Sequence, residues 1–375
     1  MRSWRERIST FKKRANDHKN HENLSRGLPL KKKFMIRADA SPAMGAGHLM
    51  RMIALGQMLS DAGQDVHFLT IPNHQDTSKR LSDEGFRVYE FQSPFTEVGD
   101  LARLVAIAEA IRPNWIVIDG YHFSGNYEKS IKTKIPSAKL LRVDDVPAIH
   151  HYADVLLNQN FGAQASAFST EPGTVLLFGP EFLLLRREFR EGCFGRKSML
   201  LKSGKMNLLV SLGGGSPMAD EANLKIAGAL HLLQGRELSL TFLAGEMSAN
   251  KEVLRERLPD DCFLIDYSAN MAREMSHADV AVVAAGSTMW ELMFMGVPFA
   301  ALSLTDAQRA YLAILGQSKL CLDLGFSPDL DSAQIAKRLE LFLDDVSSLN
   351  DMRMVCLDLV KPNTSGRRLL DVLLS

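Results

Sequence analysis

The sequence predicts an α/β protein with two doubly wound parallel-sheet domains that face each other across a cleft. From residue 34 onward, short continuous runs of Val, Ile and Leu alternate with longer amphipathic stretches, which is typical of strands buried on both faces of a parallel sheet. The same rhythm starts again after residue 205, and each half opens with a strand, a glycine-rich turn and a helix. A chain of 375 residues that is 46% hydrophobic is long enough to form two cores.

Seven apolar runs predict the strands of a first domain at residues 34–185. They lie at 34–36, 66–70, 88–91, 115–118, 140–143, 155–157 and 175–178. Amphipathic stretches between these runs predict helices, one ending near Gly63 and another ending at Pro113. Residues 186–205 begin in a basic cluster and end in a Gly/Ser/Lys stretch, which predicts an inter-domain linker.

The second domain is predicted at residues 206–375. Its expected strands lie at 207–212, 238–243, 263–265, 280–284 and 299–302. Ligands of such sheets bind at the carboxyl ends of the strands. We therefore expect the binding site in the cleft between the two domains.

Residues 1–33 carry eleven Lys and Arg against three Asp and Glu, which predicts a basic, poorly ordered extension. Weak contact of this segment with an anionic surface is the alternative interpretation. The segment has no apolar stretch of a secretory signal, and no window of the chain reaches the ~18 consecutive apolar residues of a membrane span.

Composition limits the partners and the compartment. The whole chain balances 44 basic against 44 acidic side chains, which argues against nucleic acid as a partner. The four cysteines are widely spaced and predict neither a zinc site nor a disulfide framework. Free thiols favour a reducing cytosol, so we expect a cytoplasmic protein. These cysteines are Cys193, Cys262, Cys321 and Cys356.

The first glycine-rich turn holds Gly45 and Gly47 and runs directly into His48 and Arg51. A strand, a pinched turn and a helix N-terminus bring backbone N–H groups close to a phosphate or a sugar. The same turn places an imidazole at the mouth of the cleft. The pattern therefore predicts both nucleotide binding and a catalytic role for His48.

Two further turns lie in the second half. Gly213, Gly214 and Gly215 follow its first strand, and they predict either a phosphate cradle or a tight turn without a ligand. Ser287 and Thr288 begin a helix that carries Glu291 on an apolar stretch. Glu291 is expected to bind ribose hydroxyls or to complete a capping box, and the two roles are compatible.

Several motifs together resemble a known family. Arg37, Asp39, Gly45, Gly47, His48 and Arg51 reproduce the pattern R-x-D…G-x-G-H-x-x-R. This pattern is similar to the N-terminal signature of the nucleotide-sugar hydrolases of pseudaminic acid biosynthesis. The likeness covers roughly residues 34–325 and includes the segments 119–121, 143–145, 154–160, 178–180, 186–189, 212–215 and 287–291. Gly120 stands where many relatives have His, and Ala307 where many have Asn.

The resemblance implies a fold like that of the MurG-like GT-B glycosyltransferases. It implies hydrolysis of UDP-2,4-diacetamido-2,4,6-trideoxy-β-L-altropyranose to UDP and the free sugar. By position, His48 is the catalytic histidine, the loop of Gly213, Gly214 and Gly215 holds the diphosphate, and Glu291 holds the uridine ribose. Gln308 is a nucleotide contact, and water is the co-substrate. No cofactor is implied.

The chemistry is consistent with these residues. A neutral histidine at a helix N-terminus suits a general base, because the positive end of the helix dipole disfavours the imidazolium. Asp39 is our candidate to orient His48 or a sugar hydroxyl, and Tyr121 is the candidate sugar contact. UDP is stable as an anion, so glycine-loop N–H groups can stabilise its departure without a metal.

Three alternatives remain open at this point. A GT-B glycosyltransferase would use the same UDP contacts, exclude water and admit an acceptor. A dinucleotide enzyme would need an acid about 20 residues past the glycine turn, where Thr70 ends the second strand run instead. A non-catalytic nucleotide-sugar binding protein would keep the site of the second half and would not need His48.

Overall fold

The structure of the chain is a computed structural model. It describes residues 31–41, 45–71, 75–91, 96–192, 200–202, 204–213, 215–245, 248–361 and 366–375, with side chains undescribed at 75–77. Residues 32–375 form one compact unit. Most of the predicted extension 1–33 lies outside the described residues, as do Cys193 and Gly214. No helix in the described ranges is long and apolar enough to cross a membrane.

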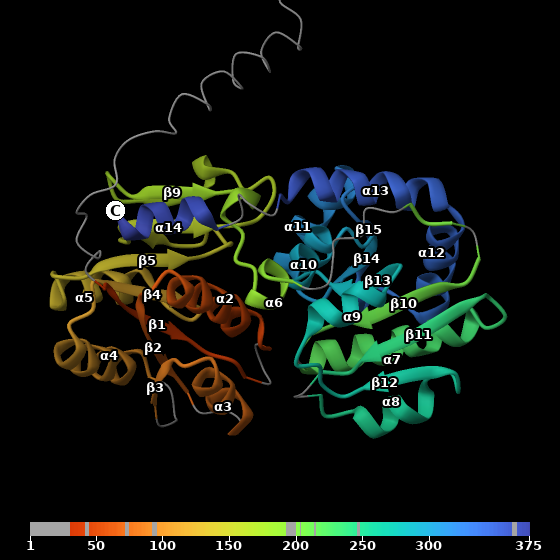
Figure 1. Ribbon diagram of the computed structural model, residues 1–375, viewed down its shortest axis with the longest axis horizontal. Coiled ribbons are helices and arrows are strands. Elements are labelled where there is room, and N and C mark those ends of the chain that lie inside the picture. The colour runs from red at the N-terminus through yellow and green to blue at the C-terminus, as the bar shows by residue number, and fades with distance from the viewer. Residues whose placement is uncertain are drawn as a thin grey trace, which may run out of the picture. The chain divides into compact units, whose positions relative to one another are not determined.

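The first sheet has seven strands in the order β3-β2-β1-β4-β5-β7-β9 (Figure 1). All neighbouring strands pair in parallel, as the continuous apolar runs predict. The strands are β1 Lys33–Ala38, β2 Asp65–Thr70, β3 Arg87–Glu90, β4 Trp115–Asp119, β5 Lys139–Val143, β7 Val155–Asn158 and β9 Val175–Phe178. The helices that follow strands of this sheet are α2 Gly47–Asp61, α3 Gln75–Asp83, α4 Glu97–Ile111 and α5 Gly125–Lys134.

The apolar runs are continuous because this sheet is covered on both faces. Phe34 and Ile36 of β1 pack with α2 in one core cluster, whereas Met35 packs with α4 and α5 in another. Successive side chains of a strand point to opposite faces, so burial on both faces needs apolar residues at every position.

The second sheet has six parallel strands in the order β12-β11-β10-β13-β14-β15. They are β10 Met206–Ser211, β11 Leu238–Leu243, β12 Cys262–Ile265, β13 Val280–Ala284, β14 Phe299–Ser303 and β15 Leu322–Phe326. The helices of this half are α7 Pro217–Leu232, α8 Lys251–Arg257, α9 Met271–His277, α10 Thr288–Met295, α11 Asp306–Gln317, α12 Ser332–Asp344 and α13 Val346–Leu359. One large core cluster joins this sheet to its helices.

Several short elements were not predicted. A two-stranded sheet pairs β6 His150–His151 with β8 Ser169–Thr170. The predicted linker contains α6 Arg187–Arg190. Short 3-10 helices lie at η1 Ala165–Ala167, η2 Pro180–Phe182 and η3 Ser327–Asp329. Among the cysteines, Cys321 and Cys356 are buried free thiols, and Cys262 is half-buried.

The last helix, α14 Arg367–Leu374, packs on the first sheet (Figure 1). Leu369 and Leu373 are fully buried in the core cluster that contains α2. The indole Nε1 of Trp115 donates a hydrogen bond to the carbonyl of Leu373 over 3.0 Å. Our sequence-based division assigned all of 206–375 to the second half. The packing differs from it at α14, because the apolar stripe of this helix is buried against the first sheet.

Candidate functional site

Two adjoining cavities lie beyond the carboxyl ends of strands from both sheets. The larger, which we name the histidine cavity, has a volume of about 210 Å³, and its walls include His48, Arg51, Tyr121, Asp145, Trp290, Ala307 and Tyr311. The smaller, which we name the glycine cavity, has a volume of about 170 Å³, and its walls include Gly45, Ala46, Gly213, Gly215, Ser216 and Thr288. Gly47, Gly286, Ser287, Thr305 and Gln308 line both, so the two cavities are continuous.

The glycine cavity is lined by the N-termini of four helices, α2, α7, α10 and α11. Ser216 caps α7 and Thr305 caps α11, each accepting a hydrogen bond from a backbone N–H in the first turn. Gly45, Gly213 and Gly215 have positive φ angles, which explains the glycines at these turns. No Lys or Arg is found among the described residues that line this cavity. An anion in this cavity would therefore be held by backbone N–H groups and helix dipoles.

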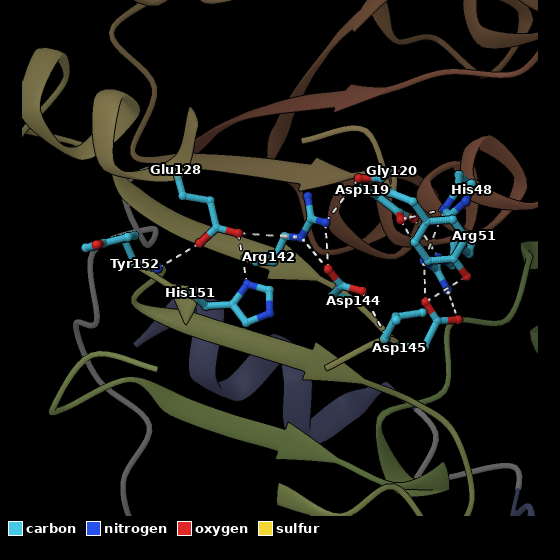
Figure 2. Close-up of polar contacts among 12 residues, drawn as sticks. His48, Arg51, Asp119, Gly120, Glu128, Arg142, Asp144, Asp145, His151 and Tyr152 are labelled. Carbon is cyan, nitrogen blue, oxygen red and sulfur yellow. Dashed lines mark hydrogen bonds and ion pairs between the residues drawn. The ribbon is translucent and has the colours of Figure 1, made fainter. Parts of the chain in front are cut away.

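His48 lies in the first turn of α2 and reaches into the histidine cavity. Its Nδ1 lies 2.8 Å from Oδ1 of Asp119, the last residue of β4 (Figure 2). Nη2 of Arg51 lies 3.1 Å from the same Nδ1 but already donates to Oδ1 of Asp119 over 2.6 Å. Because an ionised carboxylate only accepts hydrogen bonds, we assign the ring proton to Nδ1. The other nitrogen, Nε2, is then the basic one.

Arg51, one turn further along α2, holds the same carboxylate. Its Nε and Nη2 each donate to a different oxygen of Asp119 over 2.6 Å, a bidentate pair. Burial by itself would raise the pKa of Asp119, but the charges and hydrogen bonds of Arg51 and His48 outweigh burial and hold this pKa well below its usual range. Asp119 is therefore ionised at neutral pH and fixes the orientation of His48.

This arrangement corrects our assignment of Asp39. The side chain of Asp39 does not bond to His48 and lines neither cavity. It pairs with the fully buried Arg37 and accepts a hydrogen bond from the backbone N–H of Ile71 over 2.8 Å. A buried guanidinium needs anionic partners, and Asp39 takes this role for Arg37. The residue that orients His48 is Asp119. The sequence analysis placed Asp119 in the family-like segment 119–121 but assigned it no role.

Tyr121 and Asp145 line the histidine cavity beside His48. The ring of Tyr121 meets the imidazole edge to face, with ring centroids 4.6 Å apart. Its hydroxyl donates to Oδ1 of Asp145 over 3.1 Å. Asp145 also accepts from Nη1 of Arg51 over 3.3 Å. Asp145 was not predicted; the acidic pair after the apolar run 140–143 was the available signal.

The buried Arg142 bonds to residues of both of these turns (Figure 2). Nη2 of Arg142 donates to the carbonyl of Gly120 over 3.0 Å and to Asp144 over 2.6 Å. Arg142 also lies 3.6 Å from Glu128. It thus ties the turn that carries Asp119 and Tyr121 to the turn that carries Asp145. A Cβ at position 120 would lie within 3.0 Å of the ring of His122, which accounts for the glycine there.

Glu291 lines neither cavity in the described structure. Its Oε1 accepts a hydrogen bond from Nε of Arg186 over 2.9 Å and forms an ion pair with Nη2 of the same arginine, also at 2.9 Å. Burial raises the pKa of Glu291, although Arg186 opposes the shift. Ser287, the N-cap of α10, makes no side-chain cap bond, so the capping box does not form. The ribose role of Glu291 stays a prediction.

No family model matches this chain. Three curated proteins are similar to it over about three quarters of its length. An uncharacterized protein of Methanocaldococcus jannaschii is 26% identical over 74% of this chain and 57% of its own length. The spore coat polysaccharide biosynthesis protein SpsG of Bacillus subtilis is 26% identical over 77% of this chain and 83% of its own. The chain thus spans little more than half of the first of these relatives.

The third relative confirms the resemblance found in the motifs. The UDP-2,4-diacetamido-2,4,6-trideoxy-beta-L-altropyranose hydrolase of Campylobacter jejuni is 25% identical over 74% of this chain and 94% of its own length. Among solved structures, MurG of Acinetobacter baumannii superposes with a TM-score of 0.61 at 16% identity, covering 91% of this chain and 99% of MurG. A spinosyn rhamnosyltransferase, SpnG, superposes with a TM-score of 0.63 at 15% identity, covering 92% and 100%. The fold is therefore of the GT-B type, as predicted.

Proposed function

We propose that this protein is a cytoplasmic nucleotide-sugar hydrolase that cleaves a UDP-linked 2,4-diacetamido-2,4,6-trideoxy sugar to UDP and the free sugar, in nonulosonic (pseudaminic) acid biosynthesis. The observation that carries this proposal is the Asp119-held His48 in a cavity continuous with the glycine cavity. The named activity of the Campylobacter relative supports the choice of substrate.

We assign the diphosphate to the glycine cavity. Its anionic oxygens would accept hydrogen bonds from N–H groups at the N-termini of α7 and α10, and from Gly47 at the N-terminus of α2. Gly45 lines the same cavity, but its N–H donates to the carbonyl of Ser41 over 2.6 Å. Ser287 and Thr288 line this cavity and offer hydroxyl donors. The sugar would then extend into the histidine cavity, toward His48, Arg51 and Tyr121.

The reaction needs one base and a stable leaving group. Nε2 of His48 takes a proton from water as the water oxygen bonds to the anomeric carbon. The bond from that carbon to the diphosphate oxygen breaks, and UDP leaves with the electron pair. Asp119 stabilises the imidazolium that forms, and the N–H groups of the glycine cavity stabilise the charge on UDP. Tyr121 and Gln308 are proposed to contact the sugar and the nucleotide.

The test is incubation of the protein with a panel of UDP-sugars, with separate measurement of released UDP and free sugar. Hydrolysis yields both in equal amounts without an acceptor. The fold match to MurG favours one second candidate, a glycosyltransferase. That function predicts UDP release only when an acceptor is added, with the sugar attached to the acceptor.

We expect UDP to bind without a divalent metal. The glycine cavity offers helix N-termini, and no group of three or more His, Cys, Asp or Glu in the described part of the chain is arranged to hold a metal ion. Calorimetric titration with UDP should therefore give the same affinity in EDTA and in magnesium. Loss of binding on chelation would contradict this assignment.

Glu291→Ala should lower both stability and UDP affinity. The change removes a charge-assisted hydrogen bond to Arg186, worth about 1.5–3 kcal/mol of unfolding free energy. The proposed ribose contact predicts in addition a ten-fold weaker Kd, about 1.4 kcal/mol. Glu188→Ala is the matched control, because Glu188 is the other carboxylate on Arg186, at 3.1 Å. If both variants lose stability and neither loses UDP affinity, Glu291 is structural only.

A further inference from the structure

The histidine cavity holds a guanidinium that is already neutralised. Arg51 is the one Arg or Lys among the described residues that line this cavity. Each of its three nitrogens contacts a carboxylate oxygen. Nε and Nη2 bond to Asp119 over 2.6 Å, and Nη1 lies 3.3 Å from Asp145. No nitrogen of Arg51 is left without an anionic partner, so this side chain cannot offer an unopposed charge to a ligand.

The ion-pair cluster at this cavity, Arg51 with Asp119 and Asp145, therefore has more negative than positive charge. Arg51 is paired with two carboxylates, of which Asp145 lines the cavity and Asp119 does not. Burial would raise the pKa of Asp145, but Arg51 lowers it below its usual value, so Asp145 is also ionised at neutral pH. The side chain of Asp119 is fully buried, whereas that of Asp145 is 22% exposed and lines the cavity. Asp145 is thus the carboxylate that a ligand meets.

We propose that this cavity accepts nucleotide sugars whose sugar ring carries hydrogen-bond donors and no negative charge, and that Asp145 is the specificity-determining residue. The inference rests on the proposed function and narrows its substrate class. A carboxylate accepts hydrogen bonds from hydroxyl, amide or ammonium groups. It repels the carboxylate of a uronic acid or a related acidic sugar, since like charges brought together across an interface are strongly unfavourable.

The test compares UDP-glucose with UDP-glucuronate, which differ only in the carboxylate at C6, by calorimetric titration. In the wild type, UDP-glucuronate should bind on the order of 30-fold more weakly than UDP-glucose. Asp145→Asn should bring the two Kd values to within about three-fold of each other. UDP alone should bind both proteins equally, because Asp145 does not line the glycine cavity.

Asp61→Asn is the matched control. Asp61 is also an arginine-bound carboxylate, 28% exposed, and pairs with Arg187 outside both cavities. This variant should keep the wild-type ratio. Equal binding of the two sugar nucleotides by the wild type overturns the inference, as does an unchanged ratio in Asp145→Asn. If the ratio behaves as expected but no UDP-sugar is hydrolysed, the hydrolase function fails and the charge selectivity stands.

Discussion

Replacing His48 by Asn is expected to lower turnover about 10²–10⁴-fold, the usual contribution of a positioned general base. The affinity for UDP should not change, because His48 lines the histidine cavity and not the glycine cavity. Asparagine keeps a polar group that can contact Asp119 but cannot take the proton of water. Single-turnover measurement of sugar release, together with calorimetric titration with UDP, separates the two effects.

A second histidine variant gives an independent check on the role of His48. The loss of turnover should be specific to this imidazole, so substitution of a histidine outside both cavities should leave turnover unchanged. His231→Asn is a control at an exposed histidine at the end of α7. Wild-type turnover by His48→Asn would exclude the proposed mechanism even if UDP-sugars are hydrolysed.

The strands could be predicted because burial on both faces leaves an unbroken apolar run, as in β1 and β13. β15 escaped prediction because Asp323 and Gly325 interrupt its run. The place of α14 could not be predicted either. Its amphipathic sequence predicts that one face is buried. Only the tertiary structure shows that this face packs against the first sheet rather than the second.

The residues of the candidate site likewise divide into those that the sequence could predict and those that it could not. The glycine turns and His48 were predicted because strand, turn and helix are contiguous in sequence. Asp119 was missed because its contact depends on sheet register. β1 and β4 pair so that Ala38 lies opposite Asp119, and α2, which follows β1, therefore sets His48 above the end of β4. Asp39 lies one residue beyond that pairing and meets Arg37 instead. Glu291 pairs with Arg186, which lies in the connecting segment 186–205. Local sequence patterns likewise cannot predict this pairing.

Replacing Asp119 by Asn is expected to lower turnover on the order of 10³-fold, because the imidazole loses the carboxylate that sets its tautomer and stabilises its protonated form. The variant should also be less stable, since the buried Arg51 keeps only its longer contacts to Asp145. Kinetics and thermal unfolding of the same preparation measure the two effects. Asp39→Asn is the matched control, because it too removes a buried carboxylate from a buried arginine in the first half of the chain.

The two variants should lose comparable stability, and turnover should fall much further in Asp119→Asn than in Asp39→Asn.

The stability difference between the wild type and Asp119→Asn has a predictable pH dependence. The pKa of Asp119 is depressed in the folded state, so its stabilising effect is complete above the ordinary aspartate range, about pH 4, and is lost as the pH falls from there toward the folded pKa. The difference should therefore shrink on acidification below about pH 4. Equal losses of turnover in the two variants would show that Asp119 acts through stability alone and does not position His48.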